Sequence, residues 1–198
     1  MPRKSTARPT VPPAPFRPTP AQIRAAAGRP LPDVLAPDLH AVLCGINPGL
    51  YTAAVGHHFA RPGNRFWPAL AAAGITERLL APHEERELLA RGYGLTNLVN
   101  RATAGAADLD REELRAGATL LRGKLRRYRP GLLAVLGVGA FRAAFAQPLA
   151  PLGPQEETIE GVEVWVLPSP SGLNAHYSLE DLAAWLRKLR RRAEGARG

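Results

Sequence analysis

Two turns and one aromatic segment of this chain carry residue types suited to binding a flat, polar ligand. The first turn reads G-I-N-P-G at 45–49 and the second reads P-S-P-S-G-L at 168–173, with F-A-R-P-G-N-R-F-W between them at 59–67. An aromatic ring such as Phe59 offers a stacking surface. Asn47 adds a polar side chain at the end of a predicted strand, and backbone groups of the turns can bond the ligand edges. The sequence therefore predicts a binding site built from these three segments.

Apolar strands that alternate with amphipathic helices are expected to position the turns. The pattern predicts buried strands at 40–46, 95–99, 132–136 and 163–167, and helices at 21–28, 62–73, 84–91, 111–128, 138–146 and from Ser178 onward. Pro62 suits a first helical turn, and Asp181 lies three residues after Ser178 as in a capping box. Such alternation predicts a single α/β domain, with a central, mostly parallel sheet and helices on both faces. Ligands of such folds bind outside the carboxyl ends of the strands, where both turns are expected.

The cysteine count and the hydropathy of the chain exclude several classes of protein. Cys44 is the only cysteine among 198 residues, which excludes an intramolecular disulfide, a thiolate-held iron–sulfur cluster and a cysteine zinc site. No apolar run approaches the roughly 20 residues of a membrane span, and the proline-rich N-terminus lacks the apolar segment of a signal peptide. His57 and His58 lack a third partner at ligand spacing. We therefore expect a cytoplasmic protein without a metal or other cofactor.

Basic residues are concentrated at the two ends of the chain. The net charge is +9; residues 1–30 hold six basic and no acidic side chains, and residues 186–198 hold six basic side chains against Glu194. The remainder of the chain is slightly acidic. The sequence predicts a flexible, proline-rich basic tail at 1–30, a folded domain at 31–193 and a C-terminal tail at 194–198. Such tails occur on proteins that meet polyanions and also as plain solubilising segments, and the charge does not decide between them.

At four segments in register the sequence resembles the mismatch-specific uracil/thymine-DNA glycosylases of the uracil-DNA glycosylase superfamily. The matching segments are G-I-N-P-G at 45–49, F-A-R-P-G-N-R-F-W at 59–67, G-L-T-N-L-V at 94–99 and P-S-P-S-G-L at 168–173, so the likeness extends over about residues 40–190. The resemblance implies the fold of that superfamily and a DNA repair enzyme. Such an enzyme flips uracil out of a G-mismatched duplex and hydrolyses its N-glycosidic bond, leaving an abasic site. The implied partner is double-stranded DNA with a mispaired or damaged base, and a nucleoid-associated monomer is expected.

The family assigns roles to the matching residues by position. Asn47 matches the asparagine that holds the attacking water, Phe59 the aromatic residue that stacks on the flipped base, and Leu173 the wedge that enters the duplex. A wedge is physically reasonable, because extruding a nucleotide costs a few kcal/mol that an inserted apolar side chain partly offsets. The resemblance places the other contacts to the base at Gly45, Ile46, Gly49, Ala60, Asn64 and Asn97, and those of the second turn to DNA at Ser169, Ser171, Gly172 and Asn174.

Asn47, Gly49 and the lysine count refine the expected chemistry. An amide takes up no proton at neutral pH, so catalysis would depend on positioning water and on stabilising an oxocarbenium-like sugar and an anionic base. Uracil-specific relatives carry tyrosine at the position of Gly49, so its missing side chain implies room for bulkier lesions such as ethenocytosine, with thymine left open. Lys4, Lys124 and Lys188 adjoin no motif. No Schiff base is therefore expected, and the enzyme should be monofunctional, without lyase activity.

Several positions depart from the family and leave alternatives open. Ser169 stands where relatives often carry asparagine, and Asn174 and His176 follow the wedge position, where relatives often carry an arginine that reaches the opposing base. Asn64 and Asn97 fit turn-capping roles as well as contacts to the base. The alternatives are a uracil-specific glycosylase without mismatch preference, an inactive DNA-binding module of the same fold, and a small-molecule nucleotide hydrolase. The last is disfavoured, because the sequence shows no glycine-rich phosphate loop and no acidic cluster for Mg²⁺.

Overall fold

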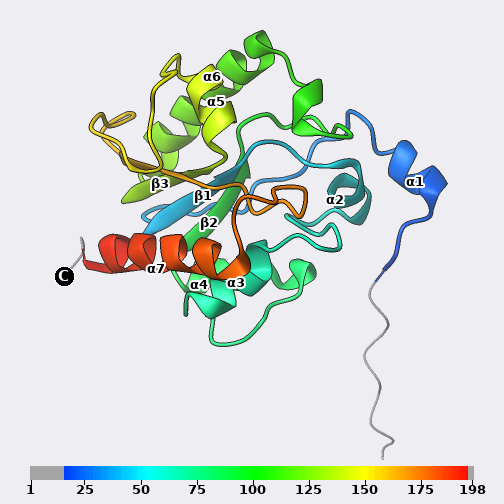
Figure 1. The fold of residues 1–198 in the computed structure, drawn as a ribbon, viewed down its shortest axis with the longest axis horizontal. Helices are drawn as coiled ribbons and strands as arrows, with labels where there is room; N and C mark the ends of the chain where they lie inside the picture. The colour runs from blue at the N-terminus through cyan, green and yellow to red at the C-terminus, as the bar shows by residue number, and fades with distance from the viewer. Residues whose placement is uncertain (1–15, 196–198) are drawn as a thin grey trace, which may run out of the picture.

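The computed structural model describes residues 16–195, which form a five-stranded sheet between two layers of helices (Figure 1). The strands are β1 Ala41–Gly45, β2 Tyr93–Asn97, β3 Leu132–Leu136, β4 Gly153–Pro154 and β5 Glu163–Leu167. Their order is β2-β1-β3-β5-β4, and all neighbours run parallel except the antiparallel pair β4 and β5. The predicted α/β class with a mostly parallel sheet is confirmed. Residues 1–15 and 196–198, which belong to the two predicted tails, lie outside the described residues.

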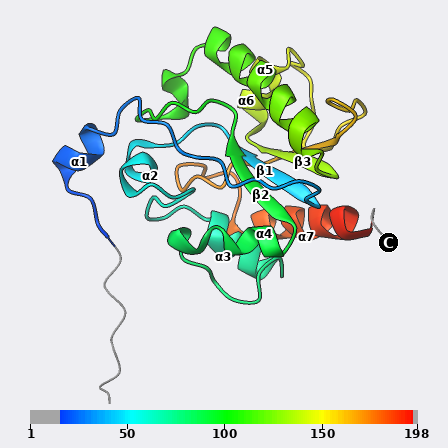
Figure 2. The ribbon, with the colours of Figure 1, turned by 180° about the vertical axis from the view of Figure 1, so that it is seen from behind.

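Helices cover both faces of this sheet. They are α1 Pro20–Arg24, α2 Leu50–Val55, α3 Phe66–Ala72, α4 Glu87–Ala90, α5 Arg111–Tyr128, α6 Val138–Ala144 and α7 Leu179–Gly195, with 3-10 turns at Pro82–Glu84 and Ala106–Asp108. Helices α5 and α6 lie on one face, and α3, α4 and α7 lie on the other, as two opposite views show (Figures 1 and 2). Helices α1 and α2 pack together at one end of the molecule.

Alternate side chains of the inner strand β1 enter opposite layers, because successive residues of a strand point to opposite faces. Ala41 and Leu43 pack in the layer of α3 and α7, whereas Val42 and Cys44 pack in the layer of α5 and α6. A strand buried on both faces needs apolar residues at every position, which explains its unbroken apolar run. The Cys44 thiol donates to the Gly45 carbonyl at 3.4 Å, and burial raises the pKa of Cys44 to about 12.

Reciprocal capping pairs fix the starts of the two long helices. At α5, Asp110 accepts from the Glu113 N–H at 2.8 Å, and the Glu113 carboxylate accepts from the Asp110 N–H at 3.2 Å. Ser178 and Asp181 make the same pair before α7, at 3.1 and 2.7 Å. The predicted capping box at Ser178 is therefore present. It fixes where the chain leaves the second turn and enters α7.

The structure moves several predicted boundaries. The helix predicted at 62–73 begins only at Phe66, and its expected proline opening falls in the preceding turn. Asn64 Oδ1 accepts from the Phe66 N–H at 2.9 Å, which starts the helix there. The strand predicted at 95–99 begins and ends two residues earlier as β2, and the helix predicted at 84–91 divides into a 3-10 turn and α4. The pattern does not reveal α2 and β4, because both are too short to show periodicity.

The part of the predicted N-terminal tail that the structure describes packs against the domain. Helix α1 is shorter than the helix predicted at 21–28. Ala26 is fully buried, and the Gly28 N–H donates to the Ala102 carbonyl at 2.9 Å. The boundary at residue 31 stays a prediction, although these contacts attach the end of the predicted tail to the fold. Among the described residues, no helix combines the length and the apolar character needed to cross a membrane.

Candidate functional site

A cavity of about 150 Å³ opens at the carboxyl ends of the parallel strands. The chain order of the strands reverses there, because β1 lies between β2 and β3, and such reversals leave a crevice for ligands. The first predicted turn follows β1 and the second follows β5, and both line the cavity although β3 separates these strands. The lining comprises 45–49, Thr52, His58, Phe59, Arg61, Asn64, Asn97, 104–106, Leu136, 169–171 and Leu173.

Most of the predicted site residues meet at this cavity. Those that line it are Gly45, Ile46, Asn47, Gly49, Phe59, Asn64, Asn97, Ser169, Ser171 and Leu173. Three others, Ala60, Gly172 and Asn174, do not line it. The structure thus brings together residues from four separate segments of the sequence. The three exceptions belong to the same loops as lining residues but do not line the cavity themselves.

Neighbouring acceptors hold the Asn47 amide in one orientation. Its Nδ2 donates to the Arg101 carbonyl at 3.0 Å and to Thr103 Oγ1 at 2.7 Å. The Thr103 hydroxyl donates its own proton to the Gly105 carbonyl at 2.6 Å, so toward Asn47 its oxygen can only accept. Both groups that face the amide are therefore acceptors, and Asn47 turns its NH₂ toward them. Its Oδ1 is left as an acceptor for a molecule in the cavity.

Phe59 and Asn97 converge on Gly45, which ends β1. A Cβ at Gly45 would lie 2.6 Å from Asn97 Oδ1 and 3.2 Å from Phe59 Cζ, so glycine is needed for both to come this close. Phe59 stacks on Phe66 with ring centroids 3.9 Å apart. Asn97 is buried, and its Nδ2 has no hydrogen-bond partner among the described residues. An unpaired buried donor costs about 1–3 kcal/mol, and Asn97 is one of the residues that line the cavity.

A buried carboxylate holds the segment that carries Phe59. Glu85 accepts from the His58 N–H at 2.7 Å and lies 2.9 Å from His57 Nδ1, and Trp67 Nε1 donates to the His58 carbonyl at 3.1 Å. Phe59 itself has a φ of 54°, a left-handed conformation that is costly for a bulky residue. Bonds to both backbone groups of His58 therefore hold a strained backbone in place.

The charges at the cavity favour a ligand that is anionic or becomes so. Arg61 is exposed at its edge, and no aspartate or glutamate lines it. Burial lowers the pKa of His58, and its Nε2 lies 3.0 Å from the Pro32 carbonyl. Because a carbonyl only accepts, Nε2 of the neutral ring carries the proton. Within residues 16–195 no group of three or more histidine, cysteine or acidic side chains could hold a metal ion.

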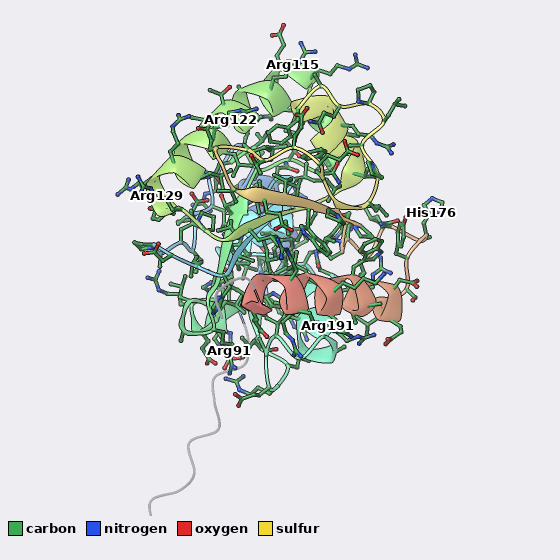
Figure 3. All side chains as sticks on the ribbon, turned by 90° about the vertical axis from the view of Figure 1, so that its left-hand side faces the viewer. Arg91, Arg115, Arg122, Arg129, His176 and Arg191 are labelled. Carbon is green, nitrogen blue, oxygen red and sulfur yellow. The ribbon has the colours of Figure 1, made fainter. Side chains whose placement is uncertain are left out.

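The second turn presents an exposed leucine beside the cavity. Leu173 is 74% exposed, and it lines the same cavity as Asn47. The turn continues into the segment from which His176 projects ahead of α7 (Figure 3). A Cβ at Gly172 would lie 2.6 Å from the Gly63 carbonyl oxygen, so glycine is needed where the two loops touch. A close approach of Gly172 to DNA stays a prediction.

Other polar residues of these loops bond within the protein. Asn174 Nδ2 donates to the Ser169 carbonyl at 3.0 Å, and Asn174 Oδ1 accepts from the His176 N–H at 3.3 Å. The Asn174 amide therefore braces its own loop, and its contact with DNA stays a prediction, whereas His176 is exposed. The Asn64 oxygen bonds the turn before α3 by accepting from the Phe66 N–H, and Asn64 also lines the cavity, so its contact with the base stays a prediction.

Sequence reasoning missed three residues that support the site, namely Glu85, Thr103 and Arg65. Thr103 lies 56 residues after Asn47 in the sequence and orients the Asn47 amide. It belongs to the loop after β2, in a stretch that contains no motif of its own. Arg65 donates to carbonyls of the loop before α7, 106 to 112 residues later in the chain. The only signal for Arg65 was its place inside the segment at 59–67.

The fold and the cavity define an α/β protein with a pocket at the carboxyl ends of its parallel strands, lined by an aromatic ring and an exposed leucine. The model of the Uracil DNA glycosylase superfamily matches residues 32–190. The chain belongs to this superfamily. Its fold is also similar to the solution NMR structure of a protein from Methanosarcina acetivorans named as a candidate uracil DNA glycosylase. The TM-score is 0.56 at 21% identity, covering 82% of this chain and 98% of that one, and at this identity the likeness supports the fold alone.

Proposed function

We propose that this protein is a DNA glycosylase that removes uracil from G-mismatched duplex DNA and leaves an abasic site. One observation carries the proposal: a single cavity combines an aromatic ring, an unpaired amide donor and an exposed leucine with the oriented amide of Asn47. Membership of the superfamily supports the glycosylase role. The proposed preference for a mismatch rests on the resemblance of the motifs alone, and the experiment below tests it.

Base extrusion is the first step of the proposed reaction. The anomeric carbon cannot be reached inside a stacked duplex, so the nucleotide turns out at a cost of a few kcal/mol. Leu173 enters the space left in the stack and partly offsets this cost. A mispaired uracil costs less to extrude than a paired base, which is one source of selectivity. In the cavity the base stacks on Phe59, and Asn97 Nδ2 donates to one of its carbonyl oxygens.

Cleavage of the glycosidic bond needs no general base at Asn47. Its Oδ1 accepts a hydrogen bond from a water and orients the water oxygen toward C1′ of the deoxyribose. The bond between C1′ and the base nitrogen breaks with its electron pair on the base, and the water oxygen bonds to C1′. The proton of the water passes to solvent or to the leaving base. The donor at Asn97 and the positive charge of Arg61 stabilise the anionic base as it forms.

The proposed product is an intact abasic site. Lys124 pairs with Asp33 at 2.8 Å, and Lys188 lies over the Trp185 ring at 4.8 Å. Neither lysine lines the cavity. Because no lysine of the described residues lines the cavity, we expect no Schiff base with the sugar and infer a monofunctional enzyme. Trapping of a covalent protein–DNA adduct by borohydride would contradict this part of the proposal.

A panel of oligonucleotides tests the proposal. Abasic sites are scored after single-turnover reaction with uracil, thymine and ethenocytosine, each opposite guanine and adenine, and with uracil in a single strand. We expect uracil opposite guanine to react fastest. Asn47→Ala is the matched control, and it should bind the same duplex with little or no cleavage.

The same panel separates the alternatives. Equal cleavage of uracil in a single strand and opposite guanine indicates a uracil-specific glycosylase without mismatch preference. DNA binding by the wild-type protein without cleavage of any substrate indicates a binding module and overturns the proposal.

A further inference from the structure

One arginine joins the two loops of the site. Arg65 donates from its guanidinium to the carbonyl oxygens of Ser171 at 2.8 Å, of Asn174 at 2.6 Å and of Tyr177. Its backbone N–H donates to the Pro170 carbonyl at 3.0 Å. Four bonds therefore run from the residue that precedes α3 to the loop at 168–177, which we call the wedge loop. The Arg65 Nε atom is buried, so this is not a free surface cation.

The wedge loop has few other bonds that would hold its shape. Those found among the described residues join positions two to five apart within it, such as the Asn174 N–H to the Ser171 carbonyl at 2.9 Å. A guanidinium suits the task, because it is planar and presents five donors in a fixed fork. Bonds from a charged donor are also stronger than neutral ones.

We propose that Arg65 is a positioning residue that holds the wedge loop so that Leu173 stands ready to enter the duplex. The inference deepens the proposed function and rests on it. A loop already ordered before binding loses less conformational freedom when DNA arrives, so more of the binding free energy remains for extrusion. Arg65 does not line the cavity, so it acts through the loop and not on the base.

Arg65→Lys tests the proposal, because an ammonium keeps the charge but cannot reach three carbonyls in a plane. The readout is fluorescence of 2-aminopurine placed beside a 2′-fluorinated, uncleavable deoxyuridine opposite guanine, together with single-turnover cleavage of the matching G·U duplex. We expect base extrusion and cleavage to fall together by about tenfold or more, the effect of losing one bond to a charged group. Arg190→Lys is the matched control, since Arg190 donates to the Gly74 carbonyl at 2.6 Å beyond the other end of α3.

A double-mutant cycle with Leu173→Ala sharpens the test. If Arg65 acts through Leu173, Arg65→Lys has little further effect on extrusion once Leu173 is truncated. The inference is overturned if Arg65→Lys, like the control Arg190→Lys, leaves extrusion and cleavage unchanged, or if it loses cleavage while extrusion stays normal. It is also overturned if the losses of extrusion caused by Arg65→Lys and by Leu173→Ala are additive. Arg65→Gln, a neutral planar amide, takes its place should the lysine variant not fold. Failure of the wild-type protein to cleave the G·U duplex would instead overturn the proposed function.

Discussion

The orientation of the Asn47 amide decides whether this residue can direct a water. The two ends of an amide have nearly the same shape, so only hydrogen bonds choose between them. Thr103 and the Arg101 carbonyl make that choice here by accepting from Nδ2. With the amide reversed, an NH₂ group would face the cavity and could not accept from water. The buried Thr103 hydroxyl is therefore part of the proposed water site without touching the substrate.

Thr103→Val should slow cleavage while leaving DNA affinity unchanged. The substitution keeps the shape of the side chain and removes one acceptor of Asn47 Nδ2, worth roughly 0.5–1.5 kcal/mol. We expect single-turnover cleavage of a G·U duplex to fall about three- to tenfold. Thr103→Ser keeps the hydroxyl and should restore the rate. A valine variant that reacts as fast as the wild-type protein would contradict this role of Thr103.

Gly49→Tyr should narrow the range of substrates. Gly49 has a φ of −72° and a ψ of 158°, which any residue adopts, and a Cβ there would meet nothing within 4 Å. A tyrosine ring at this position would occupy cavity space, so we expect loss of ethenocytosine cleavage and retention of uracil cleavage in the oligonucleotide panel. Gly49→Ala is the control and should keep both. Ethenocytosine cleavage by the tyrosine variant would show that Gly49 does not set the range.

At the residue scale the sequence predicts what lies within a motif and misses what supports it from outside. Asn47, Phe59 and Leu173 stand in short segments of unusual composition, and the structure places all three at one cavity. Arg65 acts through backbone carbonyls, which every residue possesses, and Thr103 accepts from the Asn47 amide through a hydroxyl that stands in no motif. No local pattern therefore marks either residue as part of the site.

At the element scale, two loops of the site are fixed by charged side chains. Glu85 holds the segment that carries Phe59, and Arg65 holds the wedge loop. Both bond backbone groups, so the loops keep their shape without regular secondary structure of their own. The strands ending beneath them are short and buried, and they place the loops without deciding their conformation.

Glu85→Ala should weaken base binding as well as stability. It leaves the buried His58 N–H without its partner, which costs about 1–3 kcal/mol of unfolding free energy. It also frees the strained backbone at Phe59 to relax, so we expect a higher KM for a G·U duplex. Chemical unfolding and steady-state kinetics measure the two effects. Glu87→Ala is the control, because Glu87 contacts Arg78 in an exposed pair. An unchanged KM would show that Glu85 serves stability alone.

Strands and long helices follow from the sequence, whereas short elements and loops do not. The strands at 132–136 and 163–167 and helix α5 have the predicted bounds, because long apolar or amphipathic runs and capping pairs define them. Helix α3 starts later than predicted because Asn64 Oδ1 accepts from the Phe66 N–H in the preceding turn and the Arg65 N–H bonds to the Pro170 carbonyl. That second bond depends on tertiary contact, which a local pattern does not contain.

At the scale of the whole molecule, a buried histidine couples folding to pH. Burial lowers the pKa of His58, so the folded protein takes up this proton at lower pH than the unfolded chain does. Between the lowered value and the ordinary value of about 6.5, the unfolded state binds more protons. The contribution of His58 to stability is therefore complete above pH 6.5 and is lost as the pH falls below it.

His58→Gln should reduce the loss of stability in mild acid. Urea unfolding at pH 7.5 and at pH 5.5 gives the drop in unfolding free energy for each protein. We expect a smaller drop for the variant, because its side chain has no proton to gain. The other four histidines are common to both proteins, and their contribution cancels in the comparison. Equal drops would show that His58 titrates alike in the folded and unfolded states.

Chemical labelling of Cys44 can measure how often the helices separate from the sheet. Thiol reagents attack the thiolate, and this sulfur lies fully buried on β1, between β2 and β3 of the five-stranded sheet, with a pKa of about 12. Modification in native buffer therefore requires that the sheet separate from its covering helices. Because no second cysteine competes, the rate of labelling reports that event alone. The opening of the sheet around Cys44 can thus be followed by mass spectrometry, without introducing a second cysteine.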